Sequence, residues 1–335
     1  MNRDTTLVVI DGVRTPFCKI GTALASLSAD ELGRQVVQTL LTRTGIDPAM
    51  VDEVLFGCVA QPAEATNIAR VIGLRAGLPV SVPAMTVQRN CASGFEAITT
   101  AQERMRSDRG SIFIVGGVES MSQIPMILSP EAGEKVHAVN RARTTMETVA
   151  ALAAFRPHDL RPEAGLMLGL TDPVSGLNMG QTAELLAREM GISREAQDAF
   201  ALRSQQKAAA AREKRAEEIA PVYLPEGKEA GRVVTEDNGP RPDASPDGLA
   251  GLRPVFEPAL GSVTAGNSSQ ISDGAVALLV MTAEKADELG LEPLGRLVDY
   301  AYTGCDPARM GLGPVAAIRT LRRRGFHPAE ADRVE

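Results

Sequence analysis

Apolar residues follow two different spacings along this chain, and their alternation predicts an α/β protein. Leu7 to Ile10 and Val51 to Val59 are short apolar runs, as expected of buried strands. In Ala29 to Leu41 and Asn67 to Ala76 the apolar residues instead recur at helical spacing. Strands that alternate with helices favour a largely parallel sheet that is covered by helices on both faces.

One stretch combines a predicted strand, a sharp turn and a predicted helix around a cysteine. Val82 to Val87 is largely apolar, and helical spacing begins again at Phe95. Cys91 therefore falls at the turn into a helix, beside three small residues at 92–94. A helix N-terminus offers free N–H groups and partial positive charge, which stabilise a thiolate as a nucleophile. This local pattern leaves open the alternative that Cys91 is a small buried apolar residue.

The regular alternation is lost after residue 122 and returns near residue 262. From Gln123 to Gly180, scattered Pro and Gly residues surround one stretch of helical spacing, Ala142 to Phe155, so we interpret this segment as an inserted subdomain; two more helices are predicted after it, Thr182 to Met190 and Arg194 to Lys214. The apolar stripe on the Ala142 to Phe155 helix is most often that of a helix facing the core, and contact with another surface is the alternative. Farther along, Ala275 to Thr282 and Pro293 to Ala301 are predicted to be strands, and Ala331 to Glu335 the beginning of another.

Composition narrows the class of protein. Of 335 residues, 44% are hydrophobic and only 3% are aromatic, so we expect a core of Ala, Val, Leu and Ile. A net charge of −7 argues against a nucleic-acid partner. No apolar run approaches the ~20 residues of a membrane span, and the run that starts at Leu7 is too short for a signal peptide.

Cysteine and histidine usage limits the possible chemistry. The four cysteines, at positions 18, 58, 91 and 305, show neither metal-ligand spacing nor a disulfide framework. We therefore expect no metal site, and we expect a cytoplasmic location. His137, His158 and His327 stand in polar contexts, and none forms a visible catalytic motif with Cys91. Neither a phosphate-binding P-loop nor a dinucleotide GxGxxG is present.

Short motifs along the whole chain bear a family resemblance. In order, they are Val13–Phe17, Asn90–Gly94, Gly116–Ser122, Asn178–Glu184, Leu252–Phe256, Val263–Ser269, Asp273–Ala275 and Met310–Pro314. Each is weak alone, but the ordered set is specific. It resembles the thiolases, which are acetyl-CoA C-acyltransferases. The stretches Val139–Thr144 and Leu166–Gly180 look most like the fatty-acid-oxidation thiolases that partner a multifunctional hydratase–dehydrogenase subunit.

The resemblance implies a thiolase-like layered αβαβα fold with its second core half truncated. Residues 1–118 and 262–290 would form the N-terminal core half, 119–261 the inserted loop subdomain, and 291–335 the start of the C-terminal half. Three family motifs are not found in this sequence: an NEAF-like segment, a GHP histidine and a CxGGG cysteine. Their absence leads us to expect that the chain as given is poorly active alone.

The resemblance also implies a reaction and a set of site residues. The Cys91 thiolate would attack a 3-ketoacyl-CoA, release acetyl-CoA, and pass its acyl group to free CoA in a ping-pong cycle. Ser269 would contact the pantetheine arm, and Phe256 and Met179 would line the channel. CoA would be a substrate, with no resident cofactor.

The expected partners and the alternative functions follow from the same comparison. We expect acyl-CoA and CoA as ligands and a homodimer, with a hydratase–dehydrogenase subunit as a further possible partner and membrane association left open. One alternative is a related ketoacyl-synthase-type condensing enzyme. The other, favoured by the missing motifs, is an inert CoA-binding or subunit-interaction module on a thiolase fold.

Overall fold

The computed structural model of this chain describes residues 5–225 and 230–334. Its contacts divide the chain into two compact units, residues 1–123 with 180–335, and residues 124–179. The division into two core halves and an inserted subdomain, at residues 118, 261 and 290, stays a prediction.

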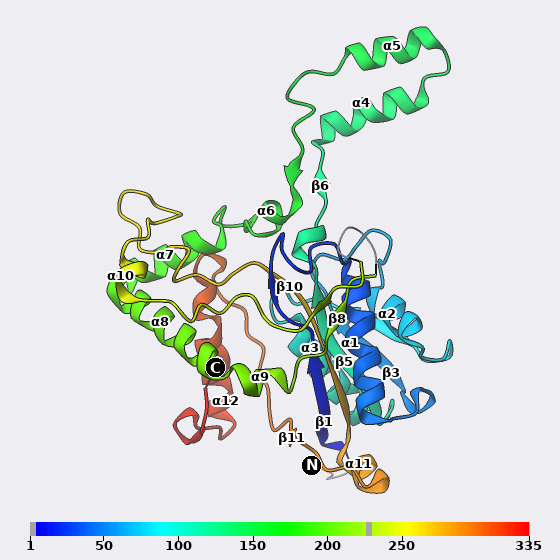
Figure 1. Cartoon of the computed structure of the whole chain (residues 1–335), viewed down its shortest axis with the longest axis vertical. Helices are drawn as coiled ribbons and strands as arrows, with labels where there is room; N and C mark the ends of the chain where they lie inside the picture. The colour runs from blue at the N-terminus through cyan, green and yellow to red at the C-terminus, as the bar shows by residue number, and fades with distance from the viewer. Residues whose placement is uncertain (1–4, 226–229, 335) are drawn as a thin grey trace. The chain divides into compact units, whose positions relative to one another are not determined.

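A seven-stranded mixed sheet forms the centre of the larger unit (Figure 1). The strand order is β11-β1-β10-β5-β3-β4, and the short β2 also pairs with β10. The strands are β1 (Leu7–Arg14), β2 (Cys18–Lys19), β3 (Glu53–Gly57), β4 (Ala84–Val87), β5 (Ile112–Glu119), β10 (Ser272–Thr282) and β11 (Gly295–Arg296). A central sheet of this kind, with helices packed on it, confirms the α/β class.

The expectation of a largely parallel sheet is wrong. β3 pairs in parallel with β4 and with β5, but β10 lies between β5 and β1 and runs antiparallel to both. The reason lies in where the chain re-enters the sheet. Gly274, near the start of β10, pairs with Glu119 at the end of β5, so β10 begins where β5 ends and must run back.

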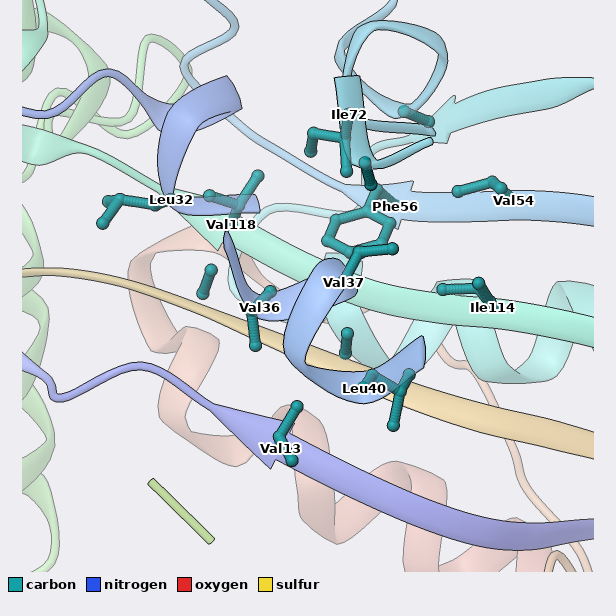
Figure 2. Close-up of a cluster of buried hydrophobic side chains, with 14 of the residues drawn as sticks. Val13, Leu32, Val36, Val37, Leu40, Val54, Phe56, Ile72, Ile114 and Val118 are labelled. Atoms are coloured by element: carbon teal, nitrogen blue, oxygen red, sulfur yellow. The ribbon is translucent and has the colours of Figure 1, made fainter. Parts of the chain in front are cut away.

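Helices cover both faces of this sheet, as the alternation predicts. On one face, α1 (Ala29–Thr44) and α2 (Ile68–Ala76) bury Leu32 and Ile72 against Phe56 of β3 and its neighbours (Figure 2). On the other face, α3 (Ser93–Arg106) packs in a second cluster with Leu55 and its neighbours. Each large side chain buried in this way contributes about 1.5–3 kcal/mol to the stability of the sheet.

Two of the family-like motifs, Val13–Phe17 and Asp273–Ala275, are hydrogen-bonded to each other. The Thr15 backbone N–H donates to the Ala275 carbonyl, and the Ala275 N–H donates to Thr15 Oγ1. A Cβ at Gly274 would lie 2.3 Å from the ring of Phe17, so any side chain there would displace that ring. Burial alone would raise the pKa of the nearby Asp237 carboxyl, but hydrogen bonds from the Arg14 guanidinium and the Phe17 N–H lower it below its usual range.

The remaining elements of the larger unit are mostly short. They are η2 (Pro48–Met50), η3 (Met121–Gln123), α7 (Met179–Glu189), α8 (Arg194–Ala210), α9 (Arg212–Ala216), β8 (Val222–Tyr223), β9 (Val233–Val234), α10 (Pro246–Ala250), α11 (Ala283–Leu289), η4 (Pro307–Leu312), α12 (Gly313–Arg323) and η5 (Pro328–Glu330). Met179, the first residue of α7, is the last residue of the smaller unit.

Of the two strand predictions near the end of the sequence, the first is confirmed only in part and the second is wrong for the described residues. Of Pro293 to Ala301, only Gly295–Arg296 pairs, as the edge strand β11 beside Val8 and Val9 of β1. β11 is the last strand of the sheet order, and the apolar side chains of Leu294 and Val298 on either side of it are exposed. Residues 331–334 form no strand, and Glu335 lies outside the described residues.

The smaller unit contains a helical hairpin where the sequence predicts one helix. It consists of β6 (Met126–Ile127), α4 (Pro130–Arg141), α5 (Thr145–Ala153), β7 (Glu163–Ala164) and α6 (Gly165–Gly169). The chain leaves helical geometry at 142–144 because Thr144 caps α5 through a reciprocal pair of hydrogen bonds with Glu147. Met146, Val149 and Leu152 are exposed, so the apolar stripe does not face a core. No helix of the described residues is long and apolar enough to span a membrane.

Candidate active site

Cys91 lies in the turn between β4 and α3, where the hydrophobic pattern predicts it, and its side chain is exposed. The alternative of a buried apolar cysteine is therefore wrong. Asn90, just before it, adopts a left-handed backbone conformation with φ of 47°. Asn tolerates this region better than most residues, but the conformation persists only where its surroundings enforce it.

Four hydrogen bonds close this turn and place Cys91 at its tip. The Ala92 N–H donates to the Arg89 carbonyl at 3.0 Å, and the Ser93 N–H donates to the Asn90 carbonyl at 3.0 Å. The buried Ser93 hydroxyl accepts from the Arg89 N–H at 2.8 Å and donates to the Asn90 carbonyl at 2.6 Å. Ser93 thus ties both ends of the turn together, although its small size was the only feature that the sequence pattern used.

Glycines allow the start of α3 to approach the sheet closely. A Cβ at Gly57, the last residue of β3, would lie 2.4 Å from the backbone carbonyl carbon of Ser93. A Cβ at Gly117 of β5 would lie 3.3 Å from the Cα of Gly94. Any side chain at Gly57 would therefore push the helix start, and with it the turn that carries Cys91, away from the sheet.

The N-terminus of α3 supplies the electrostatics that a thiolate needs. Within the described residues, the backbone N–H groups of Gly94 and Phe95 have no hydrogen-bond acceptor. Such groups, together with the helix dipole, stabilise negative charge nearby. No described side chain makes a hydrogen bond to the Cys91 thiol. The described residues thus show no proton acceptor hydrogen-bonded to this thiol, and His327 lies exposed just before η5.

The other cysteines differ from Cys91 in their surroundings. Burial, aided by the charges of Asp237 and Asp273, raises the pKa of the Cys18 thiol to about 11. Burial and the adjacent Glu119 carboxylate raise the pKa of Cys58 well above its usual range. These two thiols therefore stay protonated and inaccessible at neutral pH. Only Cys91 and Cys305 are exposed among the described cysteines.

Glu119 lies at the end of the sheet near the Cys91 turn, and sequence reasoning missed it. It ends β5, and its carboxylate accepts the N–H groups of Val59 and Ala60 at 2.9 and 3.0 Å. Because β3, β4 and β5 are parallel, the loop that Glu119 holds and the Cys91 turn both follow the carboxyl ends of neighbouring strands. The only signal in the sequence was the place of Glu119 within the motif at 116–122.

The loop that carries Ser269 is held by two acidic residues. The buried Glu184 of α7 accepts the N–H groups of Ser262 and Val263 at 2.8–2.9 Å. Asn267 donates from Nδ2 to Asp198 of α8 at 2.9 Å. Ser269 itself is exposed, and its hydroxyl donates only to the neighbouring Gln270 carbonyl, at 3.3 Å. The loop is thus rigidly supported while Ser269 faces solvent.

The two predicted channel residues lie at or near the start of α7. The half-buried ring of Phe256 lies on Gly180, where a Cβ would be 2.1 Å from two ring carbons. Met179 precedes Gly180 but belongs to the smaller unit, so only its place along the chain is described. Neither Ser269 nor Phe256 makes a hydrogen bond or ring contact with the Cys91 turn among the described residues. Their role toward CoA stays a prediction.

Comparison with known proteins decides the family. The model of the thiolase N-terminal domain matches residues 7–284. The chain belongs to the thiolase family. An acetyl-CoA acetyltransferase of Chromobacterium violaceum is 41% identical over 98% of this chain and 80% of its own length. A 3-ketoacyl-CoA thiolase of Yersinia enterocolitica is 40% identical over 97% of this chain and 74% of its own.

The thiolase fold is confirmed by a solved structure as well. The crystal structure of the Bacillus anthracis acetyl-CoA acetyltransferase superposes on this chain with a TM-score of 0.86 and 35% sequence identity. The superposition covers 98% of this chain and 78% of the Bacillus anthracis chain. The relatives of this thiolase chain are acyltransferases that carry different names. Family membership favours a thiolase over the ketoacyl-synthase alternative, but it does not by itself select a substrate.

Proposed function

We propose that this thiolase chain transfers acyl groups between CoA thioesters through an acyl-Cys91 intermediate, with 3-ketoacyl-CoA as its substrate in fatty acid β-oxidation. One observation carries the proposal: an exposed cysteine at the tip of a hydrogen-bonded turn, next to free N–H groups of a helix N-terminus. The resemblance to 3-ketoacyl-CoA thiolases supports the choice of substrate.

The reaction follows from the chemistry of a thiolate. The Cys91 sulfur attacks the carbonyl carbon at position 3 of the substrate and forms a tetrahedral oxyanion. The bond between carbons 2 and 3 then breaks, and its electron pair stays on carbon 2, which takes up a proton and leaves as acetyl-CoA. The remaining acyl group is a thioester on Cys91. The thiolate of free CoA attacks it, so that Cys91 is released and a shortened acyl-CoA departs.

The geometry of the turn suits the covalent steps more than the proton transfers. The N–H groups at the start of α3 stabilise the attacking thiolate without moving a proton. No described side chain makes a hydrogen bond to the Cys91 thiol, so we assign no residue as the base. Since loss of a general base costs roughly 10²–10⁴ in rate, a single-turnover assay tests Cys91 more directly than steady-state turnover does.

For CoA we propose the predicted contacts: Ser269 with the pantetheine arm, and Phe256 and Met179 along the channel. The support is that Ser269 is exposed on a loop whose backbone is fixed by Glu184 and Asn267. CoA is a substrate here, and the proposal uses no metal or resident cofactor. A cytoplasmic location, a homodimer and a hydratase–dehydrogenase partner also stay proposals. Sedimentation of the purified chain alone, and with that subunit, tests the two assemblies.

The reverse half-reaction provides the experiment. The chain is incubated with acetyl-CoA, quenched in acid and digested, and the Cys91 peptide is examined for an added acetyl group. We expect acetylation of Cys91 and release of one equivalent of CoA, with neither in Cys91→Ala. Cys305→Ala, which removes the other exposed thiol, should behave like the parent chain.

The lack of a hydrogen-bonded base at Cys91 favours one second candidate, a thiolase-fold module that binds CoA without chemistry. That module would bind CoA in an equilibrium titration, and Ser269→Ala would weaken the binding, but Cys91 would stay unmodified. If Cys91 remains free of acetyl while CoA binds, the module is the better account. If Ser269→Ala binds CoA as tightly as the parent, the assignment of Ser269 is wrong.

A further inference from the structure

Arg89 connects the Cys91 turn to a segment more than 200 residues later. Its backbone closes the turn, because its carbonyl accepts the Ala92 N–H and its N–H donates to Ser93 Oγ. Its side chain forms an ion pair with Glu96 of α3, and the guanidinium carbon lies 3.9 Å from the centre of the Tyr302 ring. Arg89 is thus part of the turn at one end and held by Tyr302 at the other.

Tyr302 is itself fixed on α3 at two points. Its hydroxyl makes a hydrogen bond of 2.6 Å with the hydroxyl of Thr99, which is buried. Its ring meets the ring of Phe95 edge-on, with 6.5 Å between their centres and 67° between their planes. The neighbouring Tyr300 adds a tilted ring contact at 5.9 Å and a hydrogen bond to Glu103. The segment at 300–302 therefore lies along the helix that begins at the nucleophile turn.

We propose that Tyr302 is a positioning residue that holds the Cys91 turn through Arg89. The turn needs such support, because Asn90 is in the left-handed region and Ala92 provides no side-chain cap for α3. The backbone of Arg89 belongs to the turn, and its side chain extends to the Tyr302 ring. Because the ring holds the guanidinium in place, it limits how far the Arg89 backbone, and the turn with it, can move. The inference deepens the proposed function, since it assigns a support to the residue proposed as nucleophile.

The test measures alkylation of Cys91 by limiting iodoacetamide at neutral pH, relative to free glutathione in the same tube. In Tyr302→Leu we expect Cys91 labelling to fall about fivefold, which corresponds to about 1 kcal/mol and is the size of a cation–π contact near a surface. The difference should shrink at high pH, where every exposed thiol is ionised. Tyr302→Phe keeps the ring over Arg89 and should stay within about twofold of the parent.

Three controls separate positioning from a general loss of stability. Tyr223→Leu makes the same change at a tyrosine that is 60% exposed on β8 and should leave Cys91 labelling unchanged. The buried Cys18 and Cys58 report unfolding, and they should stay unlabelled in every variant used. If Tyr302 acts through Arg89, then Arg89→Met with Tyr302→Leu should label no more slowly than Arg89→Met alone.

The proposal is overturned if Tyr302→Leu labels Cys91 like the parent, if its deficit persists unchanged at high pH, or if the effects of the two variants simply add. Because alkylation needs no acyl-CoA, these outcomes are independent of the proposed function. A chain in which Cys91 is never acetylated by acetyl-CoA would refute the proposed function, while the labelling result would still decide the role of Tyr302.

Discussion

Gly57→Ala should perturb the Cys91 turn, although residue 57 is far from that turn in the sequence. The new Cβ would lie 2.4 Å from the Ser93 carbonyl carbon, 2.5 Å from its oxygen and 2.7 Å from the Gly94 nitrogen. All three are backbone atoms at the start of α3, so no side-chain rotation can relieve the clash. Ordinary contact begins near 3.4 Å, so the helix start must move by about 1 Å.

The cost of that movement is calculated from two opposing effects. Overpacking of a close-packed site costs about 1–3 kcal/mol, while replacing Gly by Ala inside a strand returns about 0.5–1 kcal/mol of backbone entropy. We expect Gly57→Ala to lower the free energy of unfolding by about 1–2 kcal/mol. A 1 Å displacement of reacting groups costs up to about 10²-fold in rate, so acetylation of Cys91 should suffer more than stability does.

The assay combines urea unfolding with acetylation of Cys91 by acetyl-CoA, and Gly73→Ala serves as the matched control. Gly73 is also buried in the larger unit, but a Cβ there meets only Val54 Cγ2, at an ordinary 3.5 Å. As a helical Gly→Ala change it should raise stability, by up to about 1 kcal/mol, and leave acetylation unchanged. The reasoning is refuted if Gly57→Ala is as stable as the parent and acetylated at the same rate.

Three further predictions follow from the described contacts. Stability should fall as pH rises from about 9 to about 11, because the unfolded Cys18 thiol ionises before the folded one does; Cys18→Ala should show a smaller fall in urea titrations across that range. Arg14→Met removes two hydrogen bonds from the buried Asp237 carboxylate and should cost about 3 kcal/mol in unfolding free energy, whereas Arg212→Met, whose ion pair with Glu236 is exposed, should cost less than about 1 kcal/mol. Glu184→Gln should free the Ser262–Val263 backbone, lower stability by about 1–3 kcal/mol and weaken CoA binding; unchanged binding would show that the Ser269 loop does not need this support.

The turn that carries Cys91 could be predicted from sequence because its signals are local. Hydrophobic spacing placed a strand before Cys91 and a helix after it, and the small residues at 92–94 marked a close approach. The structure adds a reason for two of them: Ser93 closes the turn with its hydroxyl, and Gly94 faces Gly117 of β5. Even here, the pattern could not reveal Gly57, since its contact with Ser93 joins two separate strand–helix connections.

The features that sequence reasoning missed depend on partners far away in the chain. The antiparallel direction of β10 is set by its pairing with β5, more than 150 residues earlier. Glu184 binds backbone N–H groups that lie 78 and 79 residues later, and Arg89 meets Tyr302 only in the folded chain. The predicted helix, Ala142 to Phe155, corresponds to α5, whose start was readable because Thr144 and Glu147 form a capping box; α4, at Pro130–Arg141, was not predicted.

The central claim is that Cys91 accepts the acyl group of a 3-ketoacyl-CoA, and one single-turnover measurement tests it most directly. The chain, in excess and without free CoA, is mixed with a 3-ketoacyl-CoA, and acetyl-CoA release and the mass of the Cys91 peptide are followed together. The account predicts one equivalent of acetyl-CoA for each acyl group found on Cys91, with neither product in Cys91→Ala. Acetyl-CoA release that persists in Cys91→Ala, or an acyl group on any other residue, would contradict it.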